Sequence, residues 1–80
     1  MRLDKFLKIS RIIKRRTIAN EACDAGRIEV NGKRAKASYD VKVGDIIKVN
    51  LGSSEHEYKV MKIAQTVKKE EVGELFEQLN

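Results

Sequence analysis

Apolar residues recur at helical spacing at the start of the chain. At 100° per residue, Leu3, Phe6, Leu7, Ser10 and Ile13 fall on one side of a helix, while lysine and arginine side chains run along the opposite flank. This pattern predicts an amphipathic first helix. We expect its apolar side to be buried, because a chain this short has only a small core to build.

A second short helix is predicted over residues 17–25. Thr17 is a suitable N-cap residue, and Gly26 stands just after the helix, where glycine is favoured. The stripe between them is apolar and small, which allows close approach to the first helix; it consists of Ile18, Ala19, Ala22, Cys23 and Ala25. Cys23 falls within this stripe, so we interpret it as a packed apolar side chain and not as a nucleophile.

A β-hairpin is predicted directly after the second helix. Residues 27–30 alternate between apolar and polar, Asn31-Gly32 is a strong hairpin signal, and residues 33–37 alternate back with their cations on one face. The sequence therefore predicts a basic hairpin.

Two further strands follow the hairpin. A turn at 43–45 leads into a segment in which Ile47, Val49 and Leu51 share one face. A second turn at 52–54 leads into a strand at about 56–63. Together with the hairpin, these strands predict a compact antiparallel sheet.

The end of the chain has the spacing of a helix. Thr66 is a possible cap, and Val72, Leu75, Phe76 and Leu79 recur at i, i+3, i+4 and i+7. The spacing does not decide whether this stripe faces the sheet or another protein, although internal packing is the more common outcome.

These elements define an α+β fold class: two N-terminal helices packed on a small antiparallel sheet, plus a C-terminal helix. With 80 residues and 9.1 kDa, we expect one domain over 1–80, with a core at 1–51 and a C-terminal strand and helix at 55–80.

Composition indicates a cytoplasmic protein. No stretch exceeds two consecutive apolar residues, which excludes a membrane span and the apolar segment of a signal peptide. The single cysteine cannot form an internal disulfide, which favours a reducing compartment. The Arg-rich amphipathic start also fits a transit peptide, but its apolar residues are needed for the core.

Positive charge is concentrated in the first part of the chain. Residues 1–36 hold 11 Lys and Arg against 4 acids, a net +7, whereas residues 37–80 hold 6 against 8, a net −2. Such a concentration favours a polyanionic partner, and we expect the cations to form one surface. The cations are Arg2, Lys5, Lys8, Arg11, Lys14, Arg15, Arg16, Arg27, Lys33, Arg34 and Lys36.

The run from Lys14 to Arg16 lies just before the predicted second helix. Free backbone N–H groups at a helix start attract phosphate, and arginine adds a planar fork of donors. Asp4 is the one acid among these early cations. It either stabilises the first helix, by pairing with Lys8 or through the helix dipole, or orients an arginine for phosphate.

Catalytic chemistry is not indicated. The sequence offers no nucleophile with an adjacent base, no metal-ligand spacing and no phosphate-binding glycine motif. The lone His56 is interpreted as a surface or half-buried side chain. We therefore expect a protein without enzymatic activity, cofactor or metal.

Four segments in this order resemble the S-four (S4) RNA-binding domain family: residues 2–7 (RLDKFL), 14–17 (KRRT), 26–33 (GRIEVNGK) and 43–46 (VGDI). The resemblance covers residues 1–51 and implies an alpha-L RNA-binding motif, in which two helices and a small antiparallel sheet present a basic surface to structured RNA. It assigns RNA-facing roles to Arg2, Lys8, Arg11, Arg15, Arg16, Lys33 and Arg34, and strengthens the functional interpretation of Asp4. With the neighbouring Lys5, Lys14 and Lys36, these are the candidate RNA-binding residues.

Among stand-alone members, the chain is similar to the bacterial ribosome-quality-control factors called RqcP, since residues 66–71 read Thr-Val-Lys-Lys-Glu-Glu. That resemblance implies a protein, monomeric by expectation, that binds the large ribosomal subunit carrying peptidyl-tRNA. It would contact rRNA and tRNA, and would support alanine tailing by an RqcH-type protein.

Other interpretations stay open from the sequence. One is a ribosome-recycling factor like heat shock protein fifteen, although that group usually has a longer basic tail. Others are a module that docks a protein through the C-terminal helix and a detached module of an RNA-modifying enzyme. DNA binding is disfavoured, because both helices are short for reading a major groove.

Overall fold

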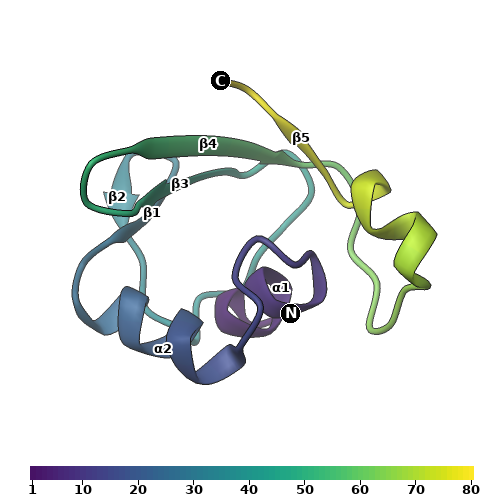
Figure 1. The fold of residues 1–80 in the computed structure, drawn as a ribbon, viewed down its shortest axis with the longest axis horizontal. Helices are drawn as coiled ribbons and strands as arrows, with labels where there is room; N and C mark the ends of the chain where they lie inside the picture. Colours follow the sequence, from purple (N-terminus) through teal and green to yellow (C-terminus); the bar gives the residue numbers. More distant parts are fainter.

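The computed structural model describes residues 1–80 as two helices beneath a sheet, with the C-terminal segment at one end (Figure 1). The five strands are all antiparallel and lie in the order β2-β1-β3-β4-β5. This confirms the predicted pair of N-terminal helices on a small antiparallel sheet. The elements are α1 (Leu3–Ile9), α2 (Arg16–Asp24), β1 (Ile28–Val30), β2 (Lys33–Arg34), β3 (Ile46–Asn50), β4 (Glu55–Val60), the 3-10 helix η1 (Lys69–Glu74) and β5 (Phe76–Gln78).

Helix α1 buries Leu3, Phe6 and Leu7 on the side that the spacing predicted. It ends earlier than the apolar stripe, because Arg11 adopts a left-handed conformation with φ 62°. Ile13 therefore reaches the core from the following turn and is half-buried. The turn is held by hydrogen bonds to carbonyls of the last helical turn, including one from the Ile13 N–H to the Leu7 oxygen.

Helix α2 is closed by a glycine, as predicted. Gly26 has φ +74°; its N–H donates to the Cys23 carbonyl, and the next N–H, from Arg27, donates to the Ala22 carbonyl. These two bonds form a Schellman motif. The helix start differs from the prediction: Thr17 is not the N-cap, because the first intrahelical bond runs from the Ala19 N–H to the Arg15 carbonyl.

The hairpin forms at the predicted place. Asn31 and Gly32 have φ values of 53° and 84°, the two positive angles of a type I′ turn. The Asn31 side chain also connects this turn to β3, because its oxygen accepts a hydrogen bond from the Ile46 N–H and its amide donates to Asp45. Asp45 in turn accepts hydrogen bonds from the Tyr39 hydroxyl and the Lys42 N–H.

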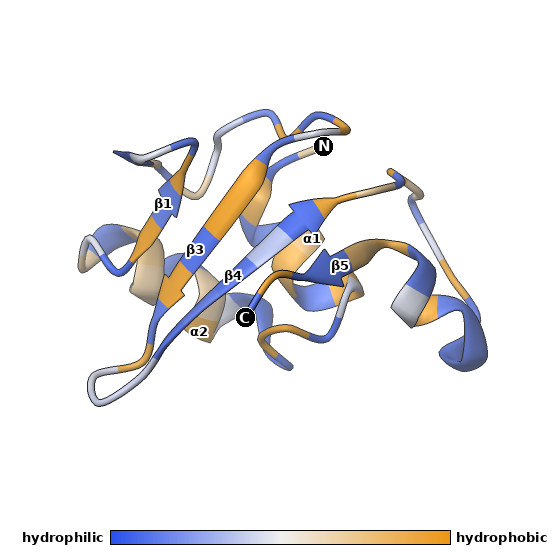
Figure 2. Ribbon diagram, turned by 90° about the horizontal axis from the view of Figure 1, so that it is seen from above, coloured by the Kyte–Doolittle hydropathy of each residue, from blue (hydrophilic) through white to orange (hydrophobic).

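The sheet has an apolar inner face and a charged outer face. Ile47 and Val49 of β3 are buried as predicted, and Figure 2 shows β3 as the most hydrophobic strand beside the polar β4 and β5. The prediction for Leu51 is wrong, because β3 ends at Asn50. Leu51 is 55% exposed where the chain turns towards β4.

The predicted C-terminal helix is wrong. Residues 69–74 form a short 3-10 helix, and the last apolar residues form strand β5, paired with β4. Gly73 weakens a helix at this position. In β5, the backbone N–H and C=O groups form hydrogen bonds with β4 instead of bonds within a helix. Leu75 is buried and Phe76 packs edge-to-face on Tyr58, so these two residues face the sheet, whereas Leu79 is 43% exposed; no amphipathic helix forms here.

The core consists of one cluster that joins both layers. The cluster's fourteen buried residues are Leu3, Phe6, Leu7, Ala19, Cys23, Ile28, Val30, Ala35, Ala37, Val41, Ile47, Val49, Val60 and Leu75.

Neither helix has the length or apolar character needed to cross a lipid bilayer.

Candidate nucleic-acid interface

A buried carboxylate connects the two helices. Asp4, in the first turn of α1, is 2% exposed, and its Oδ1 accepts a hydrogen bond from the Lys5 backbone N–H at 2.8 Å. Arg2 reaches the same carboxylate through two nitrogens, at 3.1 and 3.3 Å. From α2, the Arg16 Nε lies 3.4 Å from Oδ2, and the Asn20 amide donates to Oδ2 at 3.3 Å. Asp4 therefore holds two arginines together at the helix–helix contact.

The environment keeps Asp4 ionised. Burial alone would raise the pKa of this carboxyl, but hydrogen bonds from Arg2, Asn20 and Arg16, with the charge of Arg16, lower it to about 2. The hydrogen bond and charge of Asp4 raise the pKa of Arg2 in return. The side chains of Arg2 and Arg16 are still 50% and 47% exposed, so each guanidinium keeps donors that face solvent. Asp4 therefore contacts Arg2 and Arg16 in the structure, and its role in orienting them for phosphate stays a prediction.

A groove runs from Arg2 to the hairpin. It has a volume of about 560 Å³ and passes between α2 and the segment that begins at β2. Arg2 and Asn20 line one part of it, and Arg34 and Lys36 line another. Asp24 also borders the groove and is its only carboxylate. Residues from three separate parts of the sequence thus contribute donors to one surface.

Gly26 positions Arg34 within this groove. A Cβ at Gly26 would lie 2.7 Å from the Arg34 guanidinium carbon, closer than real Cβ contacts. The guanidinium therefore lies directly over the glycine at the end of α2, where the negative end of the helix dipole favours a cation. Gly26 therefore ends α2 and also leaves room for the Arg34 side chain.

A second group of cations lies on the other side of α1. Lys8, Arg11 and Lys14 border a separate cavity of about 420 Å³, whose far wall is the segment from Gln65 to Val72. The Lys5 ammonium donates to the Gln65 side-chain oxygen, which joins α1 to that segment. The structure therefore divides the expected single surface into two groups.

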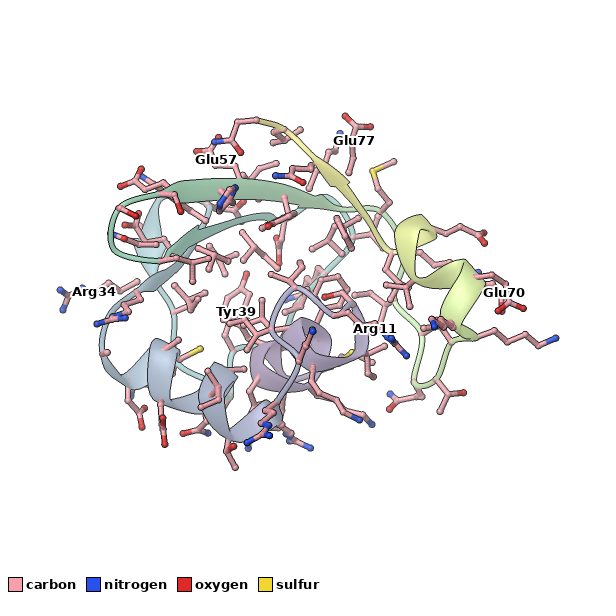
Figure 3. All side chains as sticks on the ribbon, in the orientation of Figure 1. Arg11, Arg34, Tyr39, Glu57, Glu70 and Glu77 are labelled. Atoms are coloured by element: carbon pink, nitrogen blue, oxygen red, sulfur yellow. The ribbon has the colours of Figure 1, made fainter.

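Among the ten candidate cations, only Arg2 and Arg16 form ion pairs. Arg15 and Lys33 are exposed but border neither cavity. Figure 3 shows Arg34 beside the hairpin and Arg11 between α1 and the C-terminal segment, while Glu57 and Glu77 lie beyond the sheet, away from the helices. Positive and negative side chains are thus partly separated between the two layers.

Sequence reasoning missed the uncharged residues of both sites. Asn20 stands four residues after Arg16, so it shares that face of α2, and this spacing was the available signal. Nothing local indicated that residues 65–72 would lie against α1, because that contact depends on the pairing of β4 with β5.

The interpretations of Cys23 and His56 match the structure. Cys23 is 6% exposed, and burial, with the charges of Asp4 and Asp24, raises the pKa of its thiol to about 11. His56 is half-buried on β4. No group of His, Cys, Asp or Glu side chains is arranged to hold a metal ion.

The S4 domain family matches residues 1–47, which span both helices, the hairpin and the start of β3. The chain belongs to the S4 domain family. The S4 domain thus accounts for the groove and for the cations of α1, whereas the wall formed by residues 65–72 lies outside the matched region.

Similar proteins extend this S4 assignment to nearly the whole chain. An RQC P-site tRNA stabilizing factor from Bacillus subtilis is 53% identical over 76 residues, covering 95% of this chain and 88% of the relative. A protein of the same name from Halalkalibacterium halodurans is 51% identical over 77 residues, covering 96% and 88%. A trimeric structure of heat shock protein 15 from Vibrio cholerae aligns with a TM-score of 0.89 and 32% identity, over 98% of this chain and 80% of that one.

Proposed function

We propose that this protein is a non-catalytic RNA-binding factor of ribosome-associated quality control. It binds the large ribosomal subunit carrying peptidyl-tRNA and supports alanine tailing of stalled nascent chains, together with an RqcH-type protein. The identity to RQC P-site tRNA stabilizing factors over 95% of the chain supports this assignment. We further propose that the whole chain acts as one monomeric, cytoplasmic, ribosome-associated unit.

The observation that carries this proposal is the arrangement of Arg2 and Arg16 around Asp4. The carboxylate fixes both guanidinium groups before any ligand arrives, so less side-chain entropy is lost on binding. The exposed N–H groups of each fork match the paired oxygens of a phosphate. Two arginines fixed in this way grip an RNA backbone at a defined position.

Recognition depends on the shape of the RNA. Phosphate contacts fix the position and orientation of a protein on folded RNA without reading base edges. The two cation groups would then contact different parts of the RNA surface. We propose that the contacts come from Arg2, Lys5, Lys8, Arg11, Lys14, Arg15, Arg16, Lys33, Arg34 and Lys36, with Asp4 as the residue that positions Arg2 and Arg16.

The test compares Arg16→Ala with Lys62→Ala, an exposed cation outside both groups. Binding to large subunits carrying peptidyl-tRNA should weaken roughly tenfold for Arg16→Ala, as expected for one charged contact, and stay unchanged for Lys62→Ala. The melting temperature should change little, because Asp4 keeps Arg2 and Asn20 as partners. Equal affinities of the two variants would contradict the phosphate grip.

The likeness to heat shock protein 15 supports a second candidate, a ribosome-recycling factor that acts without tailing. The two functions differ in what happens to a stalled nascent chain. In cells that lack this protein, a reporter translated from an mRNA without a stop codon should lose its C-terminal alanine extension if the quality-control function is correct. An unchanged extension would favour recycling.

A further inference from the structure

The cavity beside Lys8, Arg11 and Lys14 combines two kinds of wall. Three cations border it, and Ile9, Val67 and Val72 supply its apolar lining. Its volume is about 420 Å³, within the range of small-ligand sites. No carboxylate lines it, and none of the three cations forms an ion pair elsewhere. A surface that bound only the phosphates of an RNA duplex would not need these apolar residues.

Arg11 is held in a backbone conformation that disfavours it. The residue stands one position beyond the C-cap of α1, with φ 62°, and Gly26 occupies the equivalent position after α2 with φ +74°. Glycine adopts this conformation freely, whereas a residue with a Cβ does so at a free-energy cost. The helix would therefore end equally well with glycine, so its own termination does not explain the arginine. Local strain of this kind is concentrated at functional sites.

We propose that this cavity takes one unstacked nucleotide of the bound RNA. The phosphate lies among the three cations, and the base lies against the apolar wall. Gln65 and Thr66 border the same cavity and offer donors and acceptors to the edge of the base. Unstacked bases in loops and bulges are the usual targets of specific RNA recognition, because their faces and edges are free.

This inference rests on the proposed function and deepens it. The Asp4 cluster grips the backbone, while the cavity selects RNA in which a nucleotide is already out of the stack. The cavity is lined by none of the residues of that cluster. Each site can therefore be removed without the other.

The test uses two RNA hairpins of the same sequence, one fully paired and one with a single bulged 2-aminopurine. The wild-type protein should bind the bulged hairpin roughly tenfold more tightly and change its fluorescence, because base stacking and charged contacts each contribute at this scale. Arg11→Gly should remove the preference and leave the melting temperature unchanged or higher, because glycine relieves the left-handed backbone.

A second pair of variants tests the apolar wall. Val67→Glu places a carboxylate in the cavity and should abolish the preference, whereas Val43→Glu, at a residue 63% exposed and outside both cavities, should retain it. An excess of adenosine monophosphate tests whether the cavity takes a free nucleotide. If adenosine monophosphate does not displace the bulged hairpin, this supports a nucleotide held within RNA. Competition that displaces the bulged hairpin would overturn that part and indicate a site for free nucleotides.

Failure of this inference can be distinguished from failure of the proposed function. Equal binding of both hairpins by the wild-type protein, or no binding of the bulged one, would overturn the nucleotide site. Loss of large-subunit binding in Arg16→Ala would still support the proposed function in that case. Retention of the bulge preference by both Arg11→Gly and Val67→Glu would likewise overturn the site.

Discussion

Asp4 shows how one residue can be both buried and functional. A carboxylate with 2% exposure is destabilising unless it is paired, and this one receives donors from Arg2, Asn20 and its own helix, with Arg16 also within ion-pair distance. The same contacts that stabilise the helix pair also fix the two guanidinium groups. The structural role and the proposed functional role therefore coincide at this position.

The lowered pKa of Asp4 makes its contribution to stability dependent on pH. Because the folded value, about 2, lies below the unfolded value, the contribution is complete above pH 4 and is lost as the pH falls towards 2. It amounts to roughly 2 kcal/mol. We expect Asp4→Asn to be destabilised at pH 7, and we expect the difference from wild type to shrink between pH 4 and 2. Urea denaturation at several pH values measures this.

Asp40→Asn is the matched control for this experiment. Asp40 is also ion-paired, with the N-terminal amino group and Lys42, but its side chain is 69% exposed. Exposed pairs contribute little, so we expect a much smaller effect at every pH. Denaturation curves of Asp4→Asn that stay parallel to wild type across the pH series would contradict a role for the ionised carboxylate.

At the scale of elements, the end of α2 and the hairpin depend on one glycine. Gly26→Ala introduces backbone strain because its φ is positive, and its Cβ also displaces the Arg34 guanidinium, the far end of an exposed, flexible side chain that can move at a small cost. We expect a loss of about 1 to 2 kcal/mol for the backbone strain alone. Urea denaturation should show a larger loss for Gly26→Ala than for Gly32→Ala, where φ is +84° and nothing lies within 4 Å of the added carbon.

A double variant separates the two effects. In an Arg34→Ala background the side-chain contact is gone, so Gly26→Ala should become no more destabilising than Gly32→Ala. If the cost of Gly26→Ala stays the same without Arg34, then the guanidinium does not constrain this glycine.

Local signals were sufficient for the first half of the fold. The apolar spacing of α1, the small stripe of α2, Gly26 and the Asn31-Gly32 turn each act within a few residues, so they can be recognised without the rest of the chain. The end of the chain was different. Val72, Leu75 and Phe76 fit a helical period, but β5 forms because β4 provides a partner some twenty residues earlier.

The candidate site was predictable in its charges but not in its geometry. The cations and Asp4 were visible as a dense cluster of charge in the sequence. Their division into two groups depends on the crossing of α1 and α2 and on where residues 65–72 lie. Contacts between residues that are distant in sequence form only when the chain is packed. The sequence therefore did not predict that Arg16 would pair with Asp4 or that Gln65 would bond to Lys5.

At the scale of the whole molecule, the outer face of the sheet differs from the helical layer. Opposite charges face each other across the strands: Glu29 lies opposite Lys48, and Lys48 lies opposite Glu57. Lys48 also pairs with Glu55 at 3.2 Å. Such cross-strand pairs stabilise a sheet modestly. One lysine among three glutamates leaves these positions net negative. We therefore expect a polyanion to be attracted to the helical layer, which would orient the molecule on RNA.

The salt dependence of RNA binding measures how many phosphates are neutralised. If about six of the ten candidate cations contact phosphates at the same time, 0.7 to 0.9 counterions for each contact give a log–log slope of about −4 to −5. Filter binding to large subunits across a salt series should show this slope, and Arg16→Ala should reduce its magnitude by about one contact. An affinity that does not change with salt would exclude a phosphate-based interface.

The only cysteine of the chain allows opening of its core to be measured by thiol labelling. Cys23 borders the groove but is 6% exposed, and its raised pKa keeps it protonated near neutral pH, where only the thiolate reacts. A thiol reagent should therefore label the folded protein slowly, at a rate set by transient opening of α2. Large-subunit RNA that fills the groove should slow labelling further. Rapid labelling of the free protein in the absence of urea would show direct access instead.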